Sequence, residues 1–76
     1  MKTEDILKEV SYYYKIDESE LVQKTRKREI LEKRQMAMYL SCLFKTDSLS
    51  QIGYKIGKKD HATVINARKV ISDLID

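Results

Sequence analysis

The residues best suited to chemistry lie between Gly57 and Val64, where the sequence is Gly-Lys-Lys-Asp-His-Ala-Thr-Val. Gly57 is expected to stop one helix, and Asp60 is expected to cap the next. The first turn of that second helix would present His61 outward, as a hydrogen-bond donor or acceptor for a partner. Two lysines adjoin it with no opposing acid except the cap, which favours a groove-facing role over a merely solvated histidine.

The sequence does not contain a combination of residues typical of a catalytic site. The single cysteine, Cys42, and the single histidine, His61, would form a catalytic pair only within hydrogen-bond reach, which the helical pattern does not require. They also fall short of a complete structural zinc site. The segment Gly53 to Lys59 differs from a phosphate-binding loop in its glycine spacing and lacks a preceding strand. We therefore expect no enzyme activity, no cofactor and no metal, and Cys42 to be a packing residue.

The composition limits the fold and the cellular setting. The chain has 76 residues, enough for one domain, with no proline, two glycines and 36% charged residues, which favours helices. One cysteine cannot form an internal disulfide, as expected in a reducing compartment. No apolar run approaches the roughly 18 residues of a membrane span, and the acidic N-terminus does not resemble a signal peptide. We expect a cytoplasmic protein with no membrane partner.

Positive charge gathers in two separate segments. Residues 24–34 carry six bases and two acids, a net +4, and residues 55–69 carry five bases and one acid, also a net +4. Residues 1–23 carry a net −3. The pattern indicates a footprint for a polyanion if the fold brings both segments to one face. The alternative is that these bases only solvate helix surfaces.

Apolar residues at helical spacing predict an all-α domain of about five helices over residues 1–76, with a helix-turn-helix at about 48–76. The first helix is expected at about 4–15, and a short second helix follows a capping box of Asp17 and Glu20. The third is expected at about 28–45. The fourth runs from its cap Ser48 to its stop at Gly57, and the fifth covers 60–76. A basic loop at 24–28 separates the second helix from the third.

The third helix is apolar on two sides, which predicts that other helices surround it. The expected core is Ile6, Val10, Tyr13, Tyr14, Ile30, Leu31, Met36, Ala37, Met38, Leu40, Cys42, Leu43, Phe44, Leu49, Ile52, Ile56, Val64, Ala67, Ile71 and Leu74. For the two tyrosines, a core or core-edge position is favoured over stacking on bases. Lys33, Arg34 and Gln35 cannot all be buried and are expected to emerge at the surface near the basic loop.

Three motifs resemble a known family. They are Arg-Gln-Met-Ala-Met-Tyr-Leu at 34–40, Ser-Leu followed by Ile-Gly within 48–53, and Ile-Gly-Lys-Lys-Asp-His-Ala-Thr-Val at 56–64. In order and spacing the chain resembles the C-terminal DNA-binding domain of the DnaA family of bacterial replication initiators, over nearly its whole length. The resemblance implies a Trp-repressor-like helical domain that recognises a DnaA box in duplex DNA.

The resemblance also implies roles for individual residues. Arg26 matches the loop arginine that enters the minor groove, and Arg34 and Gln35 match the pair that holds the phosphate backbone. Asp60 and His61 match the first base-contacting positions of the recognition helix, and Thr63 matches a hydroxyl residue near base and backbone. The DNA-binding set is completed by Arg28, Ser50, Lys58, Lys59, Ala62 and Asn66.

The sequence departs from the family pattern at the turn and the recognition helix. Lys58 replaces the second glycine of a Gly-Gly-Arg turn, and Lys59 replaces the arginine, which keeps the charge but loses the bidentate fork. Ala62 replaces a threonine or serine. A hydroxyl contact is thereby lost, although the alanine methyl can still pack against a thymine methyl.

No ATPase domain precedes these motifs, which leaves an excised domain or a free-standing DnaA-like protein, and Met1 favours the latter. The expected partners are duplex DNA with a DnaA-box-like site, bound by a nucleoid-associated monomer, and replication-initiation proteins. The alternative is a regulator or interaction module related to DnaA that docks on a partner protein without box-specific binding. RNA binding is disfavoured because no strand platform with exposed aromatics is expected.

Overall fold

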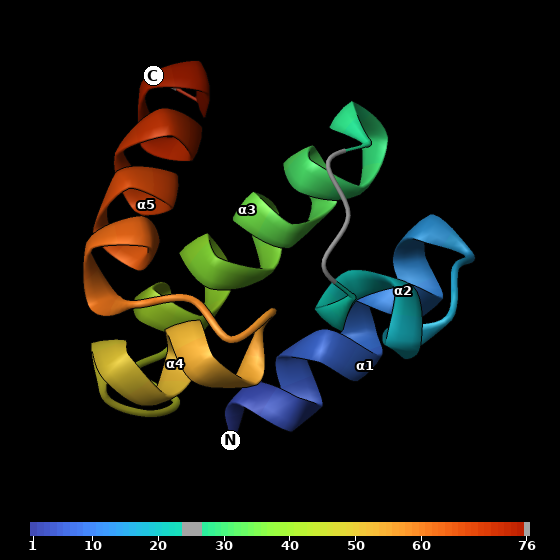
Figure 1. Cartoon of the computed structure of the whole chain (residues 1–76), viewed down its shortest axis with the longest axis horizontal. Coiled ribbons are helices and arrows are strands. Elements are labelled where there is room, and N and C mark those ends of the chain that lie inside the picture. The colour runs from blue at the N-terminus through green and yellow to red at the C-terminus, as the bar shows by residue number, and fades with distance from the viewer. Residues whose placement is uncertain (24–26, 76) are drawn as a thin grey trace.

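The computed structural model describes residues 1–23 and 27–75, and its regular elements over these ranges are all helices (Figure 1). They are α1 (Thr3–Tyr14), α2 (Glu18–Val22), α3 (Arg28–Leu43), α4 (Leu49–Lys55) and α5 (His61–Ile75). The predicted all-α class is confirmed, with α4 and α5 as the pair of the helix-turn-helix. Within the described ranges, no helix has the length and apolarity needed to cross a membrane.

Local chemistry sets most of the helix ends. α1 ends before Lys15 and α3 before Lys45, earlier than predicted, because these lysines adopt left-handed conformations with φ of 58° and 52°. Ser48 caps α4 as predicted, since its Oγ accepts a hydrogen bond from the Gln51 N–H at 3.3 Å. The predicted cap hydrogen bond from Asp17 is absent, although α2 begins at the next residue.

α3 is the central helix and contacts each of the other four. In Figure 1 it crosses the molecule between α5 on one side and α1 with α2 on the other. The buried hydrophobic residues are Ile6, Leu7, Val10, Leu21, Ala37, Met38, Ile52, Ile56, Val64, Ala67 and Ile71. Cys42 is partly buried against this core, and burial raises the pKa of its thiol, in agreement with a packing role.

Several apolar residues predicted to be buried are exposed. Tyr13 is 78% exposed and Leu74 is 77% exposed. Leu31, Leu43 and Phe44, near the two ends of α3, are exposed as well. Helical periodicity identifies an apolar face, but burial also needs another element over each turn of that face. None of the described residues covers these five side chains enough to bury them.

A polar cluster connects α4 to the start of α1. The Thr3 backbone N–H and hydroxyl donate to Asp47 Oδ2 at 3.2 and 2.7 Å. Lys55 Nζ lies 3.1 Å from the same oxygen and 2.8 Å from Glu4 Oε1. The hydrogen bonds from Thr3, followed by the one from Lys55, lower the pKa of Asp47 to about 2. The cluster thus fixes the loop that leads into α4.

Candidate nucleic-acid interface

The turn between α4 and α5 folds back onto the end of α4. The backbone N–H groups of Lys58 and Lys59 donate to the carbonyl oxygens of Tyr54 and Gly53 at 3.0 and 2.8 Å. Gly57 has a φ of 94° and Lys58 a φ of 56°, so two successive residues have positive φ. The predicted stop of the fourth helix at a left-handed Gly57 is confirmed.

Gly53 permits this close return of the chain. A β-carbon at this position would lie 2.5 Å from the Lys59 carbonyl oxygen and 2.8 Å from the Asp60 carbonyl oxygen. No side chain fits at such distances, so the glycine determines how near to α4 the helix α5 begins. The sequence patterns placed Gly53 in a failed phosphate loop and in a motif of the resemblance, but did not predict this close approach. The sequence feature that could have identified this role is a glycine inside a predicted helix, where glycine costs about 1 kcal/mol of stability relative to alanine.

Asp60 caps α5, as predicted. Its Oδ1 accepts hydrogen bonds from the Thr63 backbone N–H at 3.0 Å and from the Thr63 hydroxyl at 2.9 Å. The backbone hydrogen bond, followed by the hydroxyl one, lowers the pKa of Asp60. The ionised carboxylate therefore fixes both the first turn of α5 and the side chain of Thr63.

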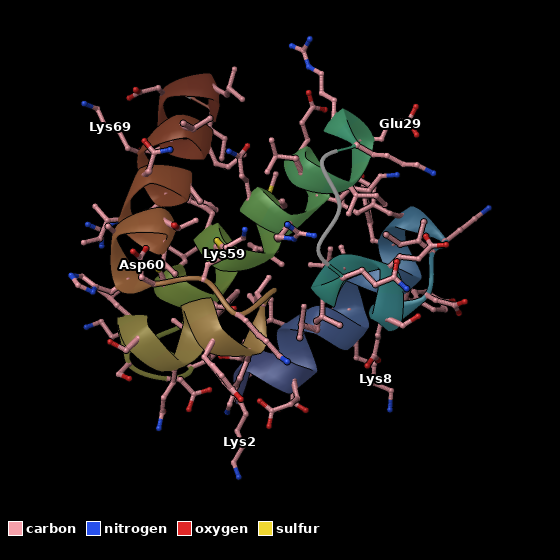
Figure 2. All side chains as sticks on the ribbon, viewed as in Figure 1. Lys2, Lys8, Glu29, Lys59, Asp60 and Lys69 are labelled. Carbon is pink, nitrogen blue, oxygen red and sulfur yellow. The ribbon has the colours of Figure 1, made fainter. Side chains whose placement is uncertain are left out.

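The turn before α5 and the first turns of α5 present a group of exposed, mostly polar residues. Val64, Ala67 and Ile71 face the core, and Ile65 is 41% exposed. The predicted DNA-binding residues Lys58, Lys59, Asp60, His61, Ala62, Thr63 and Asn66 are all exposed. In Figure 2, Lys59 and Asp60 lie at the turn and Lys69 lies farther along α5. The set offers ammonium, imidazole, hydroxyl and amide groups, and Asp60 is its one acid. Such a surface can donate several hydrogen bonds to an anionic partner.

The other basic segment is described only in part. Residues 24–26, with the predicted minor-groove residue Arg26, lie outside the described residues. Lys27 and Arg28 are exposed, and Arg28 Nε lies 3.4 Å from Glu32 Oε1. Both side chains of this ion pair are well solvated, so water and salt screen it strongly and Arg28 can exchange it for another anion.

Arg34 does not lie where the sequence predicts. It is only 3% exposed, so the expectation that it emerges at the surface is wrong. Its Nε donates to the Leu21 carbonyl oxygen at 2.9 Å, and its Nη2 donates to the Gln23 carbonyl oxygen. These carbonyls at the end of α2 draw the guanidinium inward, and burial lowers the pKa of Arg34. Lys33 and Gln35 on either side are partly buried.

The sequence is similar to known proteins over nearly its whole length. Residues 3–71 match the family model of the bacterial DnaA helix-turn-helix. The chain belongs to this family. Over 73 residues it is 45% identical to the chromosomal replication initiator protein DnaA of Rickettsia canadensis, Rickettsia massiliae and Rickettsia rickettsii. Each alignment covers 96% of this chain, and the chain spans 16% of the length of each relative.

Membership of the DnaA helix-turn-helix family agrees with the backbone of the turn. The pattern expected from the resemblance has a second glycine where this chain has Lys58, and Lys58 adopts a left-handed φ of 56°. Glycine reaches that conformation without strain, whereas a lysine does so at a cost. The turn therefore has a glycine-type backbone at a position that carries an additional positive charge.

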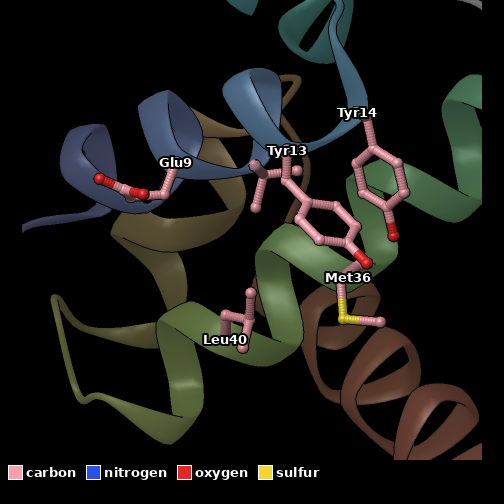
Figure 3. A pocket seen from close by; sticks show the side chains of 6 residues that line it. Glu9, Tyr13, Tyr14, Met36 and Leu40 are labelled. Carbon is pink, nitrogen blue, oxygen red and sulfur yellow. The ribbon is translucent and has the colours of Figure 1, made fainter.

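A separate apolar groove lies between α1 and α3 (Figure 3). Its volume is about 370 Å³, and it is lined by Glu9, Val10, Tyr13, Tyr14, Met36 and Leu40. The rings of Tyr13 and Tyr14 meet edge to face, with centroids 5.1 Å apart. No predicted DNA-binding residue belongs to the described lining, so the groove is distinct from the candidate interface.

Proposed function

We propose that this chain is a single domain that binds duplex DNA sequence-specifically, at a site of the DnaA-box type. The observation that carries the proposal is the exposed first turn of α5, where His61, Ala62 and Thr63 lie beside two lysines. Membership of the DnaA helix-turn-helix family supports duplex DNA as the target. The proposal includes a role in replication initiation, which the same membership supports, and a nucleoid-associated monomer in the cytoplasm.

In this proposal α5 enters the major groove. His61 hydrogen-bonds a base edge, and the Ala62 methyl packs against a thymine methyl. Thr63 can still accept a hydrogen bond while its proton is donated to Asp60. Asn66, exposed farther along the helix, can contact an adenine edge or a phosphate. Specificity therefore comes from a small number of side chains at the start of one helix.

Contacts outside the major groove supply most of the affinity. Phosphates are bound by Gln35, Ser50, Lys58 and Lys59. Arg26 enters an adjacent minor groove, and Arg28 binds the backbone beside it. Arg34 is left out of this contact set because its guanidinium is buried. These contacts make binding strongly dependent on salt.

Fluorescence anisotropy with a DnaA-box duplex and a scrambled duplex of equal length tests the proposal. His61→Ala should reduce the discrimination between them by about 1–3 kcal/mol. Lys59→Ala should weaken both duplexes alike and lower the salt slope by about one unit. Lys8→Ala, at an exposed lysine on α1 away from the turn (Figure 2), is the matched charge control and should have little effect.

Equal affinity for the two duplexes at about 0.15 M salt would contradict sequence-specific binding. Absence of binding to either duplex at low salt would point instead to the alternative of an interaction module that docks on another protein. In vitro selection of bound duplexes would then define the preferred base at each position, and in particular the base opposite Ala62.

A further inference from the structure

The groove between α1 and α3 has large aromatic side chains at its edge. In Figure 3 the rings of Tyr13 and Tyr14 extend from α1 toward α3. Tyr13 is 78% exposed, and the adjacent Tyr12 is 84% exposed. Tyrosine is enriched in binding surfaces, because its ring buries much apolar area while its hydroxyl can still form a hydrogen bond. The exposure of Tyr12 and Tyr13 therefore favours a binding role over the core position that helical spacing predicted.

The other side of the groove is an apolar stripe on α3. Met36 and Leu40 line the groove and are partly buried. Leu43, three residues after Leu40, is 59% exposed. Spacings of four and three residues place these three side chains along one side of the helix. The stripe thus continues beyond the groove, and the described part of the chain leaves it open to solvent.

The aromatic wall is formed in the free chain. The Tyr13 and Tyr14 rings meet edge to face, with centroids 5.1 Å apart. Lys33 Nζ lies 5.4 Å from the centroid of the Tyr14 ring, over its face. Ring contacts of this kind restrict the side-chain rotamers. A partner that docks on the wall therefore loses little affinity to the ordering of these side chains.

The charge at the edge of the groove is negative. Glu9 is the one charged residue in the described lining, and Asp5, one turn earlier on α1, is exposed as well. Lys8 lines a separate hollow, together with Tyr12 and Lys15. Residues 1–23 as a whole carry a net −3. Carboxylates at an open edge attract cationic side chains and repel phosphates, so the charge favours a basic protein segment over stacking on bases.

A helix fits this groove better than an extended segment does. The main-chain amides of α1 and α3 are bonded within their own helices, so neither side offers the partners that an extended peptide needs. A helix satisfies its own main chain, and its side chains at i, i+3, i+4 and i+7 can pack along the stripe that contains Met36 and Leu40. Lysine or arginine beside those side chains can then face Glu9.

We propose that the groove between α1 and α3 is a docking site for an amphipathic helix of another protein, with an apolar stripe flanked by lysine or arginine. The stripe packs against Tyr13, Met36 and Leu40, and the flanking cations face Glu9. This surface is additional to the proposed duplex-binding function, because none of its described lining residues belongs to the predicted DNA-binding set. A helix bound here leaves the exposed start of α5 free.

Titration of the isotope-labelled chain with two synthetic peptides tests the proposal by nuclear magnetic resonance, without DNA. Both peptides have about 16 residues, roughly 24 Å as a helix, with leucine at i, i+3, i+4 and i+7. One carries lysine beside the leucines, and the other carries glutamate at the same positions. The lysine peptide should shift the amides of residues 9–14 and 36–43 but not those of 61–66. It should bind at least about fivefold more tightly than the glutamate peptide at about 0.15 M salt.

Charge reversal at the edge of the groove should reverse this preference. Glu9→Lys should weaken binding of the lysine peptide about fivefold and strengthen binding of the glutamate peptide. Glu29→Lys makes the same charge change at an exposed position of α3 outside the described lining (Figure 2) and should keep the wild-type preference. Both replaced side chains are exposed, so both variants should remain folded, which circular dichroism checks.

Removal of an aromatic ring tests the apolar part of the site. Tyr13→Ala should weaken binding of both peptides by about tenfold, because the ring contributes contact area whatever the charge of the partner. Tyr54→Ala removes a tyrosine that is 66% exposed on α4 and should bind both peptides like the wild type. Equal affinities of these two variants would show that the aromatic wall takes no part in docking.

Three results would each overturn the docking site: equal affinity for the two peptides, amide shifts confined to residues outside the groove, or the same change in Glu9→Lys and Glu29→Lys. If single-stranded oligothymidine shifted residues 9–14 more strongly than the lysine peptide, the groove would instead be a base-stacking surface. If the same amides shifted with chain concentration alone, it would be a contact between copies. Failure of the proposed function would not affect these titrations, because they contain no duplex, and failure of docking would leave binding of the box duplex unchanged.

Discussion

The turn between α4 and α5 and the C-terminal end of α2 are anchored in opposite ways. The turn between α4 and α5 is fixed by its own backbone, through the Lys59 N–H bound to the Gly53 carbonyl at 2.8 Å and through the positive φ of Gly57. The chain that leaves α2 is anchored by one side chain from another helix, Arg34. Substitutions in the turn should therefore act locally, whereas loss of Arg34 should loosen both the end of α2 and its packing against Gly57.

The largest loss of stability is expected for Gly53→Ala, which would disrupt the backbone contacts that hold the turn between α4 and α5. The new β-carbon would meet the carbonyl oxygens of Lys59 and Asp60 at 2.5 and 2.8 Å, and neither can move without displacing α5. Overpacking of this kind should lower the free energy of unfolding by about 2–3 kcal/mol, measured by urea denaturation. Gln51→Ala, at an exposed position on the same helix, should stay within about 0.5 kcal/mol of the wild type. Equal stability of the two variants would show that the turn is not held by this contact.

A smaller loss of stability is expected when Asp60 is replaced, because its carboxylate caps the first turn of α5. Asp60→Ala loses the hydrogen bonds to Thr63 and should be less stable at neutral pH, whereas Asp60→Asn keeps a good cap. Because the folded-state pKa is lowered, the stabilisation by the charge is complete above the ordinary value of 3.8 and is lost as pH falls through the lowered value.

Thermal unfolding of both Asp60 variants across this pH range measures the effect. The difference between the wild type and Asp60→Ala should narrow at acidic pH. A difference that stays constant down to the lowest pH at which the wild type folds would mean that the ionised cap does not contribute.

The smallest effect on stability is expected for Lys58→Gly. This variant separates the contribution of the backbone conformation at the turn from that of the lysine charge. Glycine relieves the left-handed strain but has more entropy to lose on folding, so the stability should change by less than about 1 kcal/mol. Duplex affinity should nevertheless fall, because a phosphate contact is lost. Lys45→Gly makes the same backbone change at a φ of 52° near the end of α3 and should leave affinity unchanged. Equal losses of affinity in the two variants would contradict a phosphate contact by Lys58.

Local sequence patterns predicted the features that depend on neighbouring residues. The cap at Ser48, the stop at Gly57 and the cap at Asp60 each involve partners within a few positions along the chain. Helical spacing likewise predicted which side of α5 is buried, through Val64 and Ala67. For these features the periodicity and the capping rules carry enough information, because the hydrogen bonds and faces involved are set within one or two helical turns.

Only the tertiary structure decided features that depend on distant residues. The same periodicity placed Tyr13 and Leu74 in the core, but no described element covers them, and both remain exposed. Arg34 was expected at the surface because charge usually is, yet carbonyls 13 and 11 residues earlier in the chain and a glycine in a later turn surround its guanidinium. A sequence shows which groups can form hydrogen bonds, and the packing of separate helices determines whether water or another part of the chain satisfies them.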